Sequence, residues 1–405
     1  MERLETTPTK YKNTDCETNI NYVVKISRTL LTPIGIYPLH GSGTALSNFL
    51  VTIQIIIIFS LMLFLLVPHL IYTYWDAEDL TKLMKIIAAQ VFNSLALIKF
   101  WTMIINKDSL RWCLAEIQDS WRNVSCDEDK QVMIKNAKTG RFLTVAYLSL
   151  SYGGALPYHI VMPLVAERIV KPDNTTQIPL PYPCDYVFFV PQDSPGYEML
   201  FVTQIIISSL ILSTNCGIYS LIATYIVHAC CLFEIVGRHL DEVGKTVEGE
   251  VLQKLTQVID KHTFAMKYAL TLEKSLNIVF LSEMVGCTII ICFLEYGILL
   301  DFGEKNYLGM VTYVVLMTSI LVNVFILSFI GDRLKEQSSK ISEYTYDLEW
   351  HSMPKHMVHN LLFIMIRSNQ PVTLTAGKLF DVSLQGFADV VKTSAAYLNF
   401  LRAVV

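Results

Sequence analysis

Charged residues are scarce in this sequence. Only 17% of its 405 residues are Asp, Glu, Lys or Arg, whereas 52% are hydrophobic and the mean hydropathy is +0.42. A soluble globule of this length needs more polar surface than that, so the composition excludes this class and points to lipid as a solvent. The net charge is -4 and there is no long basic block, which gives no support for a nucleic-acid partner.

The sequence also lacks the motifs on which catalysis and cofactor binding depend. It has no Gly-rich phosphate loop, Walker sequence or nucleophile elbow. His356 and His359 are three residues apart, but no carboxylate or cysteine follows at zinc-ligand spacing. Of the nine cysteines only Cys184 falls in an expected outer loop, so no disulfide is expected there. We therefore expect no enzyme activity, no cofactor and no metal.

Long apolar stretches are what the sequence does have. A helix needs ~20 apolar residues to cross the ~30 Å hydrocarbon core of a bilayer. Four uncharged regions are long enough: 29–75, 142–166, 199–233 and 306–331. Three further candidates carry charges, at 83–105, 275–300 and 382–401. The sequence therefore predicts an all-α membrane protein with seven transmembrane helices.

The charges inside the three weaker spans need an explanation, because charged groups in lipid are costly. Glu283 and Glu295 in the fifth span should face protein or water. Lys85 and Lys99 lie near the ends of the second span, where we expect their long side chains to extend to the interface.

The distribution of basic residues predicts the orientation. Residues 1–28 are polar and mixed in charge, unlike a secretory signal, so we expect a cytoplasmic amino terminus. Seven spans then place 24 of the 32 Lys and Arg in four cytoplasmic segments, 1–46, 106–141, 228–274 and 331–378, as the positive-inside rule requires. The carboxyl terminus is extracellular. This is the reverse of a metabotropic G-protein-coupled receptor, which is the less favoured seven-helix alternative.

The outer loop at 171–195 is rich in proline, so it should be an extended or ordered connector, and possible roles are a passive link or a lid over a ligand pocket. Its sequon at Asn174 is predicted to be glycosylated, whereas the sequon at Asn123 lies in a cytoplasmic loop and should stay unmodified.

The cytoplasmic segments also show helical periodicity. Apolar residues recur every three or four positions at Leu240, Val243, Val247, Val251, Leu255, Val258, His262 and Met266. The fourth and fifth helices should therefore extend below the membrane. Segments 228–274 and 331–370 together form a predicted cytoplasmic anchor region, which packs either within one subunit or between subunits.

The carboxyl-terminal sequence resembles that of insect odorant receptors. The match rests on PVTLTAGKLFDVSLQGFADVVKTSAAYLNFLRAVV, residues 371–405, including the lead-in Leu374 to Lys378 and the run Lys392 to Tyr397. Gly331-Asp332-Arg333-Leu334 after the sixth span fits the same family. Gustatory receptors end in a different pattern, and the odorant receptor co-receptor has a much longer loop between the fourth and fifth helices.

This resemblance implies a ligand-tuning odorant receptor subunit that forms a ligand-gated, non-selective cation channel with the co-receptor, as a heterotetramer in the plasma membrane of olfactory sensory neurons. The alternative is a gustatory-type homotetrameric channel. The implied parts are a cytoplasmic segment at 1–46, helices one to six with an outer-half ligand pocket at 47–330, the anchor region, and a pore-lining seventh helix at 377–405.

The seventh span is too polar to face lipid and should line water. Steps of three and four residues place Gln385, Asp389, Thr393, Ala396, Phe400 and Val404 on one face. Several subunits would turn Phe400 and Val404 into hydrophobic rings that stop ions by dewetting. The family resemblance also places the constriction here, with Asn399 and Ala403 nearby.

The resemblance further implies an apolar pocket for a small volatile or semi-volatile molecule among helices two to six. Residues at the corresponding depth offer aromatic walls and a few hydrogen-bond partners: Ile87, Gln90, Ser151, Gly154, Tyr158, Gln204, Ser208, Tyr296, Met310 and Tyr313.

Overall fold

The chain folds almost entirely into helices. The computed structural model describes residues 13–37, 44–75, 80–165, 168–170, 176–177, 179–186, 194–246 and 250–404. In these ranges the seven predicted spans are occupied by α2 (Ala45–Trp75), α3 (Leu80–Ile105), α5 (Asp127–Val165), α6 (Gly196–Gly244), α7 (Val251–Gly303), α8 (Tyr307–Tyr346) and α10 (Leu384–Val404). The shorter helices are α1 (Cys16–Leu31), α4 (Lys107–Arg122) and α9 (Lys355–Ser368), with a 3₁₀ turn, η1 (Trp350–Ser352). The predicted all-α fold class is confirmed.

Five of the described helices are long and apolar enough to cross a membrane by composition alone, namely α2, α3 from Ile86, α6, α7 and α8. Helices α5 and α10 contain more polar residues. Both lie against the apolar helices, because α5 packs on α6 and α8 while α10 packs on α7 and α8. Polar side chains in a span are tolerated when they face protein or water instead of lipid.

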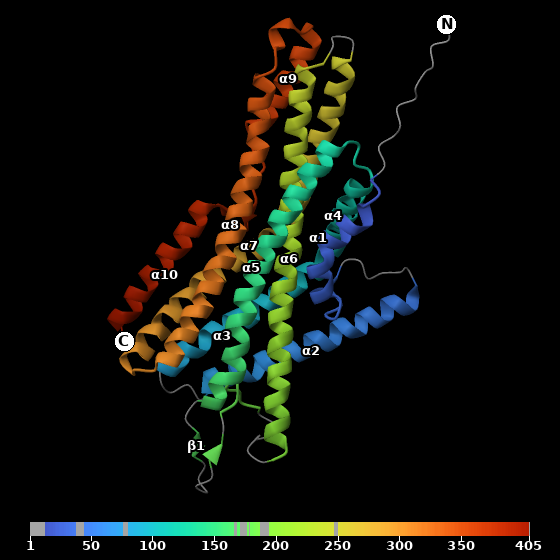
Figure 1. Cartoon of the computed structure of the whole chain (residues 1–405). Coiled ribbons are helices and arrows are strands. Elements are labelled where there is room, and N and C mark those ends of the chain that lie inside the picture. Colours follow the sequence, from blue (N-terminus) through green and yellow to red (C-terminus); the bar gives the residue numbers. More distant parts are fainter. Residues whose placement is uncertain are drawn as a thin grey trace.

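Helices α6, α7 and α8 continue far beyond the apolar spans, and the extensions of α6 and α7 were predicted from their periodicity. Figure 1 shows the end of α6, the start of α7 and the end of α8 rising together beside α9, on the side of the molecule away from the carboxyl terminus. Leu240, Leu255, Val258, Leu334 and Ile341 are buried in this extension. Apolar stripes that would be exposed on single helices therefore cover one another. Val247 lies outside the described residues.

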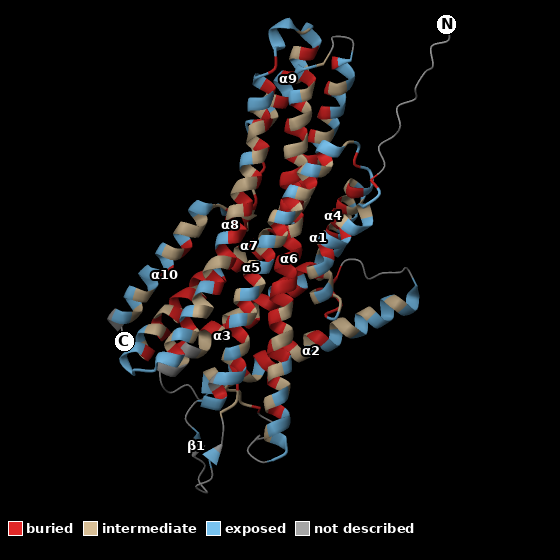
Figure 2. Ribbon diagram, viewed as in Figure 1, coloured by how far each residue is buried: buried red, intermediate tan, exposed pale blue. Residues whose placement is uncertain are grey.

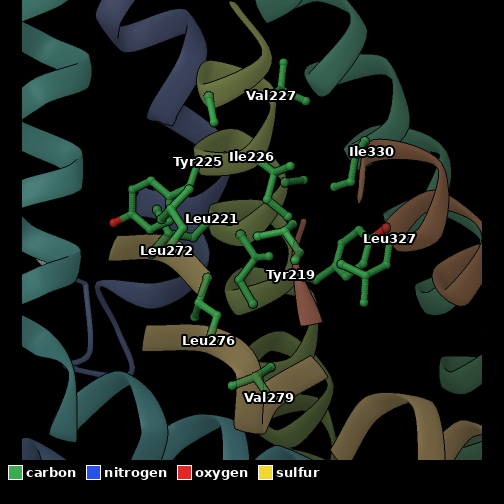
Figure 3. Packing of buried hydrophobic residues seen from close by; sticks show 14 of the residues in the cluster. Tyr219, Leu221, Tyr225, Ile226, Val227, Leu272, Leu276, Val279, Leu327 and Ile330 are labelled. Atoms are coloured by element: carbon green, nitrogen blue, oxygen red, sulfur yellow. The ribbon is translucent and has the colours of Figure 1, made fainter. Parts of the chain in front are cut away.

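The core of the molecule is centred on α6. Tyr219, Leu221, Tyr225 and Ile226 of α6 lie between Leu272, Leu276 and Val279 of α7 and Leu327 and Ile330 of α8 (Figure 3). Figure 2 shows the middle of α6 as largely buried, whereas α2 and α10 are mostly intermediate or exposed. Lipid contact accounts for the exposed apolar side chains of α2, such as Leu46 and Ile56.

The first uncharged stretch, 29–75, is not one helix. Helix α1 ends at Leu31, a turn containing Gly35 at φ +78° follows, and the span α2 begins at Ala45. Pro33 stands just after α1 and favours its termination. Helix α1 packs on α6, where a Cβ on Gly217 would come within 2.6 Å of Leu31 Cδ2. The absence of charge did not reveal this break.

A short hairpin precedes the last helix. Strands β3 (Thr375–Ala376) and β4 (Phe380–Asp381) pair antiparallel, and the turn between them has Gly377 at φ +59°. The predicted pore segment 377–405 therefore begins with hairpin residues, and its helix starts at Leu384. A second small hairpin, β1 (Ile169–Val170) with β2 (Thr176–Gln177), lies in the outer loop. Asn174 lies outside the described residues.

Candidate ligand cavity and pore helix

A cavity of about 90 Å³ lies among α3, α5, α6, α7 and α8. Because one water needs only ~10–15 Å³, the cavity has room for a compact organic molecule. Its wall is mainly apolar and aromatic, and consists of Ala88, Ala89, Phe92, Tyr147, Ser151, Ala155, Tyr158, His159, Tyr182, Leu212, Ile290, Leu294, Tyr313, Leu316, Ser319 and Ile320.

Two polar pairs interrupt this apolar wall. The hydroxyl oxygens of Ser151 on α5 and Ser319 on α8 are 3.0 Å apart. The Tyr182 hydroxyl and His159 Nε2 are 3.2 Å apart, and the two rings are stacked. Such a cavity favours a small uncharged ligand with few polar atoms.

The outer loop contributes the Tyr182 side chain to the cavity. Gln204 of α6 holds this part of the loop, because its Oε1 accepts from the Tyr182 backbone N–H at 3.0 Å and its Nε2 donates to the Tyr182 carbonyl oxygen at 3.2 Å. The described residues of this loop before α6, 176–177, 179–186 and 194–195, contain no helix, as the prolines of the loop predicted. Its Tyr182 side chain forms part of the cavity wall, so this segment is more than a passive link.

Three of the ten predicted ligand-binding residues line this cavity, namely Ser151, Tyr158 and Tyr313. Gln90 is directed elsewhere and donates to the His69 carbonyl oxygen at 3.0 Å. A Cβ on Gly154 would contact Val315 Cγ1 at 3.2 Å, so this glycine allows α5 to approach α8. The remaining predicted residues do not belong to the lining: Ile87, Gln204, Ser208, Tyr296 and Met310.

Most of the lining was not predicted. Ala88 and Ala89 directly follow the predicted Ile87, so the cavity lies at the same depth but on another face of α3. Tyr147 lies one turn from Ser151 and His159 follows Tyr158, so a search for aromatic and polar neighbours along α5 would have found both. Tyr182 comes from a loop, for which helical periodicity carries no signal.

Lys99 does not extend to the interface, contrary to the sequence prediction. Its side chain is buried in the bundle, and its Nζ lies 2.5 Å from Glu283 Oε2 on α7 and 3.0 Å from Asn215 Oδ1 on α6. Glu283 also accepts a hydrogen bond from Asn323 Nδ2 on α8. An ion pair between neighbouring helices removes the cost of a lone charge, which a single span viewed alone does not reveal.

The family-like motif after the sixth span holds the start of α10. Asp332 Oδ2 accepts from the Leu384 N–H at 2.9 Å, at the amino-terminal end of α10. Lys335 pairs with Asp381 at 3.0 Å. At Gly331 a Cβ would lie 2.3 Å from the Val382 carbonyl oxygen, so only glycine fits against this part of the chain.

One side of α10 packs on the bundle and the other is exposed in the described chain. Val390 and Ser394 are buried, and the Phe387 ring contacts the Phe325 ring of α8 at 5.6 Å. The predicted pore residues that lie on the exposed side are Gln385, Asp389, Thr393, Ala396, Asn399 and Phe400. Phe400 is 65% exposed, although it is a large aromatic residue. Ala403 and Val404 belong to the last turn of α10.

A charged network joins the helices at the cytoplasmic side. The buried Asp129 carboxylate of α5 lies 2.5 Å from Arg238 and 3.0 Å from His239, both on α6, and 3.7 Å from Lys261 on α7. Burial by itself would raise the pKa of Asp129, but the hydrogen bonds from His239 and Arg238 and the charges of His239 and Lys261 outweigh it and hold the pKa well below its usual range. The network ties the extensions of α6 and α7 to the base of α5.

Comparisons with known proteins agree with this architecture. Residues 79–395 match the family model described as 7tm Odorant receptor. Odorant receptor 13a of Drosophila melanogaster is 22% identical over 281 residues, 65% of this chain and 67% of its own. Odorant receptor 82a of the same species is 20% identical over 83% of this chain and 88% of its own.

The fold is shared with a solved receptor. The olfactory receptor OR5 of Machilis hrabei in complex with eugenol superimposes with a TM-score of 0.83 at 14% identity, over 96% of this chain and all of the other. A second structure of that receptor superimposes with a TM-score of 0.79 at 16% identity. Since the family model covers more than half of the sequence, the chain belongs to the odorant receptor family of multi-pass membrane proteins, which are chemoreceptors and not enzymes.

Proposed function

We propose that this chain is the ligand-tuning subunit of a ligand-gated, non-selective cation channel, and that it works with the odorant receptor co-receptor in a heterotetramer. The observation that carries the proposal is the exposed polar face of α10. A helix with Gln385, Asp389 and Thr393 exposed on one side is costly in lipid and favourable beside water. Copies of such helices around an axis would enclose a hydrated pore, with Asp389 favouring cations.

The cavity supports binding of a small neutral volatile or semi-volatile molecule. It is lined by five helices and Tyr182, and the serine pair and the His159–Tyr182 pair offer hydrogen bonds within an apolar wall. The similarity to a receptor solved with eugenol supports this use of the bundle. We propose Ser151, Tyr158 and Tyr313, together with Tyr147, His159 and Tyr182, as ligand contacts.

In the proposed mechanism, the ligand binds more tightly to an open arrangement of the bundle than to a closed one, and this difference in affinity shifts the equilibrium. Helix α10 then moves outward and widens a ring formed by Phe400, with Val404 one turn further on. The site of action would be the plasma membrane of olfactory sensory neurons.

The test is ligand-evoked current in cells that express the chain alone or with an insect co-receptor, using a panel of volatile esters, alcohols, aldehydes and phenols. We expect current only when both subunits are present. Current from the chain alone would support the homotetrameric alternative. A response to ligand that depends on a G protein, without any current through the receptor itself, would reject the channel function.

A further inference from the structure

The buried ion pair between Lys99 and Glu283 lies at the centre of a polar cluster that joins four helices. Lys99 of α3 contacts Glu283 of α7 and Asn215 of α6, and Asn323 of α8 donates to Glu283. The side chains of Lys99 and Glu283 are 5% and 4% exposed. Two full charges at this depth are expensive and are usually kept only where they have a task.

This cluster lies directly beneath the ligand cavity. On α3 the cavity residue Phe92 is two helical turns from Lys99, and on α7 the cavity residue Ile290 is two turns from Glu283. On α8 the cavity residue Ser319 is one turn from Asn323. Since residues at these spacings share a helix face, helices that form the wall of the cavity also form the cluster.

Aromatic contacts make the connection continuous. The Tyr147 ring lines the cavity and lies 4.3 Å, centroid to centroid, from the Tyr219 ring of α6. The Tyr219 hydroxyl donates to the Asn323 carbonyl oxygen at 3.3 Å. A shift of Tyr147 on ligand binding would therefore press on the residue that holds Glu283.

Residues next to the cluster on α7 and α8 lie against the pore helix. Met284, which follows Glu283, lies with Thr288 of α7 along a groove whose opposite side is formed by Asp389 and Thr393 of α10. On α8, Phe325 is two residues after Asn323 and contacts Phe387 of α10. The helices tied together by the ion pair are therefore those that hold α10.

The cluster has hydrogen-bonding capacity to spare. Among the described residues, Asn215 Nδ2 and Asn323 Oδ1 are buried and have no hydrogen-bond partner. Lys99 and Glu283 could exchange partners with these amide groups if α3 moved relative to α7. A buried polar network with unused groups can support two discrete arrangements, whereas an apolar contact of the same size has no such alternatives.

We propose that Lys99 and Glu283 are positioning residues that couple occupancy of the cavity to movement of α10. The proposal rests on the channel function proposed above. The pair fixes α3, which carries ligand-contacting residues, to α7, which supports the pore helix. Ligand binding is transmitted by a rearrangement of this pair.

The experiment compares the unaltered pair with Lys99→Met/Glu283→Met and with the charge swap Lys99→Glu/Glu283→Lys. Each is placed in a chain carrying Ala396→Cys on the exposed face of α10, expressed with the co-receptor. The double Met change removes both charges, and so it avoids the unpaired buried charge that Lys99→Met alone would leave. The first measurement is the rate at which a thiol reagent modifies Cys at position 396, with and without an activating ligand.

We expect the ligand to change this rate by ~5-fold or more when the pair is intact, a typical size for coupling between sites. In the double Met variant the ligand should no longer change the modification rate, although it should still bind and raise the melting temperature. The charge swap should restore the ligand-dependent change in rate. The matched control is Lys245→Met/Asp241→Met, which removes an exposed ion pair at the carboxyl-terminal end of α6. In this control the ligand should change the modification rate as much as in the intact chain.

Current is the second measurement and separates this inference from the proposed function. A ligand-dependent modification rate without any current would reject the channel function and leave the coupling intact. The inference is overturned if the double Met variant shows the same ligand-dependent rate as the intact pair, or if the ligand does not alter the rate with the pair intact.

Discussion

The Gln204 side chain on α6 forms two hydrogen bonds with the backbone of Tyr182, one to its N–H at 3.0 Å and one to its carbonyl at 3.2 Å. This contact is between a membrane helix and the outer loop, and it presents the Tyr182 ring to the ligand cavity. Gln204 was predicted to touch the ligand, but its place in the structure is one layer behind the wall.

Gln204→Leu should release this loop. Both backbone groups of Tyr182 would lose a partner, at a cost of ~1–3 kcal/mol for each buried group that stays unpaired. The concentration of ligand for half-maximal current should therefore rise ~10-fold. Ser208→Ala, one turn away on α6, is the control, because within the described residues that hydroxyl bonds to its own helix at the Ile205 carbonyl. An unchanged dose–response curve for Gln204→Leu would contradict a role for the loop.

Filling the cavity should exclude large ligands first. Ala155 lines the cavity from α5, so Ala155→Leu adds three carbon atoms to a space of about 90 Å³. We expect weaker responses to bulky ligands and smaller losses for compact ones, measured as the ratio of half-maximal concentrations. Val161→Leu adds one carbon atom on the exposed side of the same helix and should change the half-maximal concentration of neither the bulky nor the compact ligands.

Phe400→Ala should increase current in the absence of ligand. A ring of aromatic side chains closes a pore by excluding water, and smaller side chains let water remain. Phe302→Ala is the control, because Phe302 is an aromatic residue of similar exposure, 67%, at the far end of α7. Equal basal currents in the wild type and Phe400→Ala, at matched surface expression, would count against a gate at this position.

His262 should make the cytoplasmic extension sensitive to acid. Burial, with a smaller contribution from the charge of Arg367, lowers the pKa of His262 to about 4. In the unfolded chain the pKa of a histidine is ~6.5. Between pH 6.5 and pH 4 the folded chain therefore binds fewer protons than the unfolded chain. The contribution of His262 to stability is present above pH 6.5 and is lost as the pH falls toward 4. The contribution of His262 to the free energy of unfolding should decrease by ~2 kcal/mol between pH 7 and pH 5.

The measurement is the free energy of unfolding of the purified chain in detergent at both pH values. His262→Leu keeps an apolar contact with Phe233, whose ring centroid lies 6.1 Å away, and should reduce the pH dependence. If the variant retains the full pH dependence, other groups are responsible for it.

The sequence was sufficient for the number, order and approximate bounds of the membrane helices. Uninterrupted apolar runs are long only where lipid or a buried core surrounds the helix, and this property is local in the chain. The extensions of α6 and α7 were also predicted, because apolar residues at three and four residue spacing mark one helix face. The predicted start of the first span at residue 47 is close to Ala45, but helix α1 and the turn after it were not predicted, since neither charge nor length reveals a turn within an uncharged stretch.

Sites that depend on which helices are neighbours were predicted less well. Predicted ligand residues on α5 and α8 line the cavity, whereas Ile87 on α3 does not, because a helix that is apolar all round gives no indication of which side faces the cavity. On α10 the polar residues gave that indication, and the predicted face is the exposed one.

The sequence by itself determined that this chain spans a membrane seven times, keeps its basic segments on one side and ends in a helix with one polar face. All of these follow from the cost of placing charges and bare backbone groups in lipid. Only the tertiary structure decided that Lys99 meets Glu283 instead of extending to the interface, and that Tyr182 reaches the cavity. Both depend on contacts between residues distant in sequence, and a buried charge or loop side chain becomes favourable only when its partner is in place.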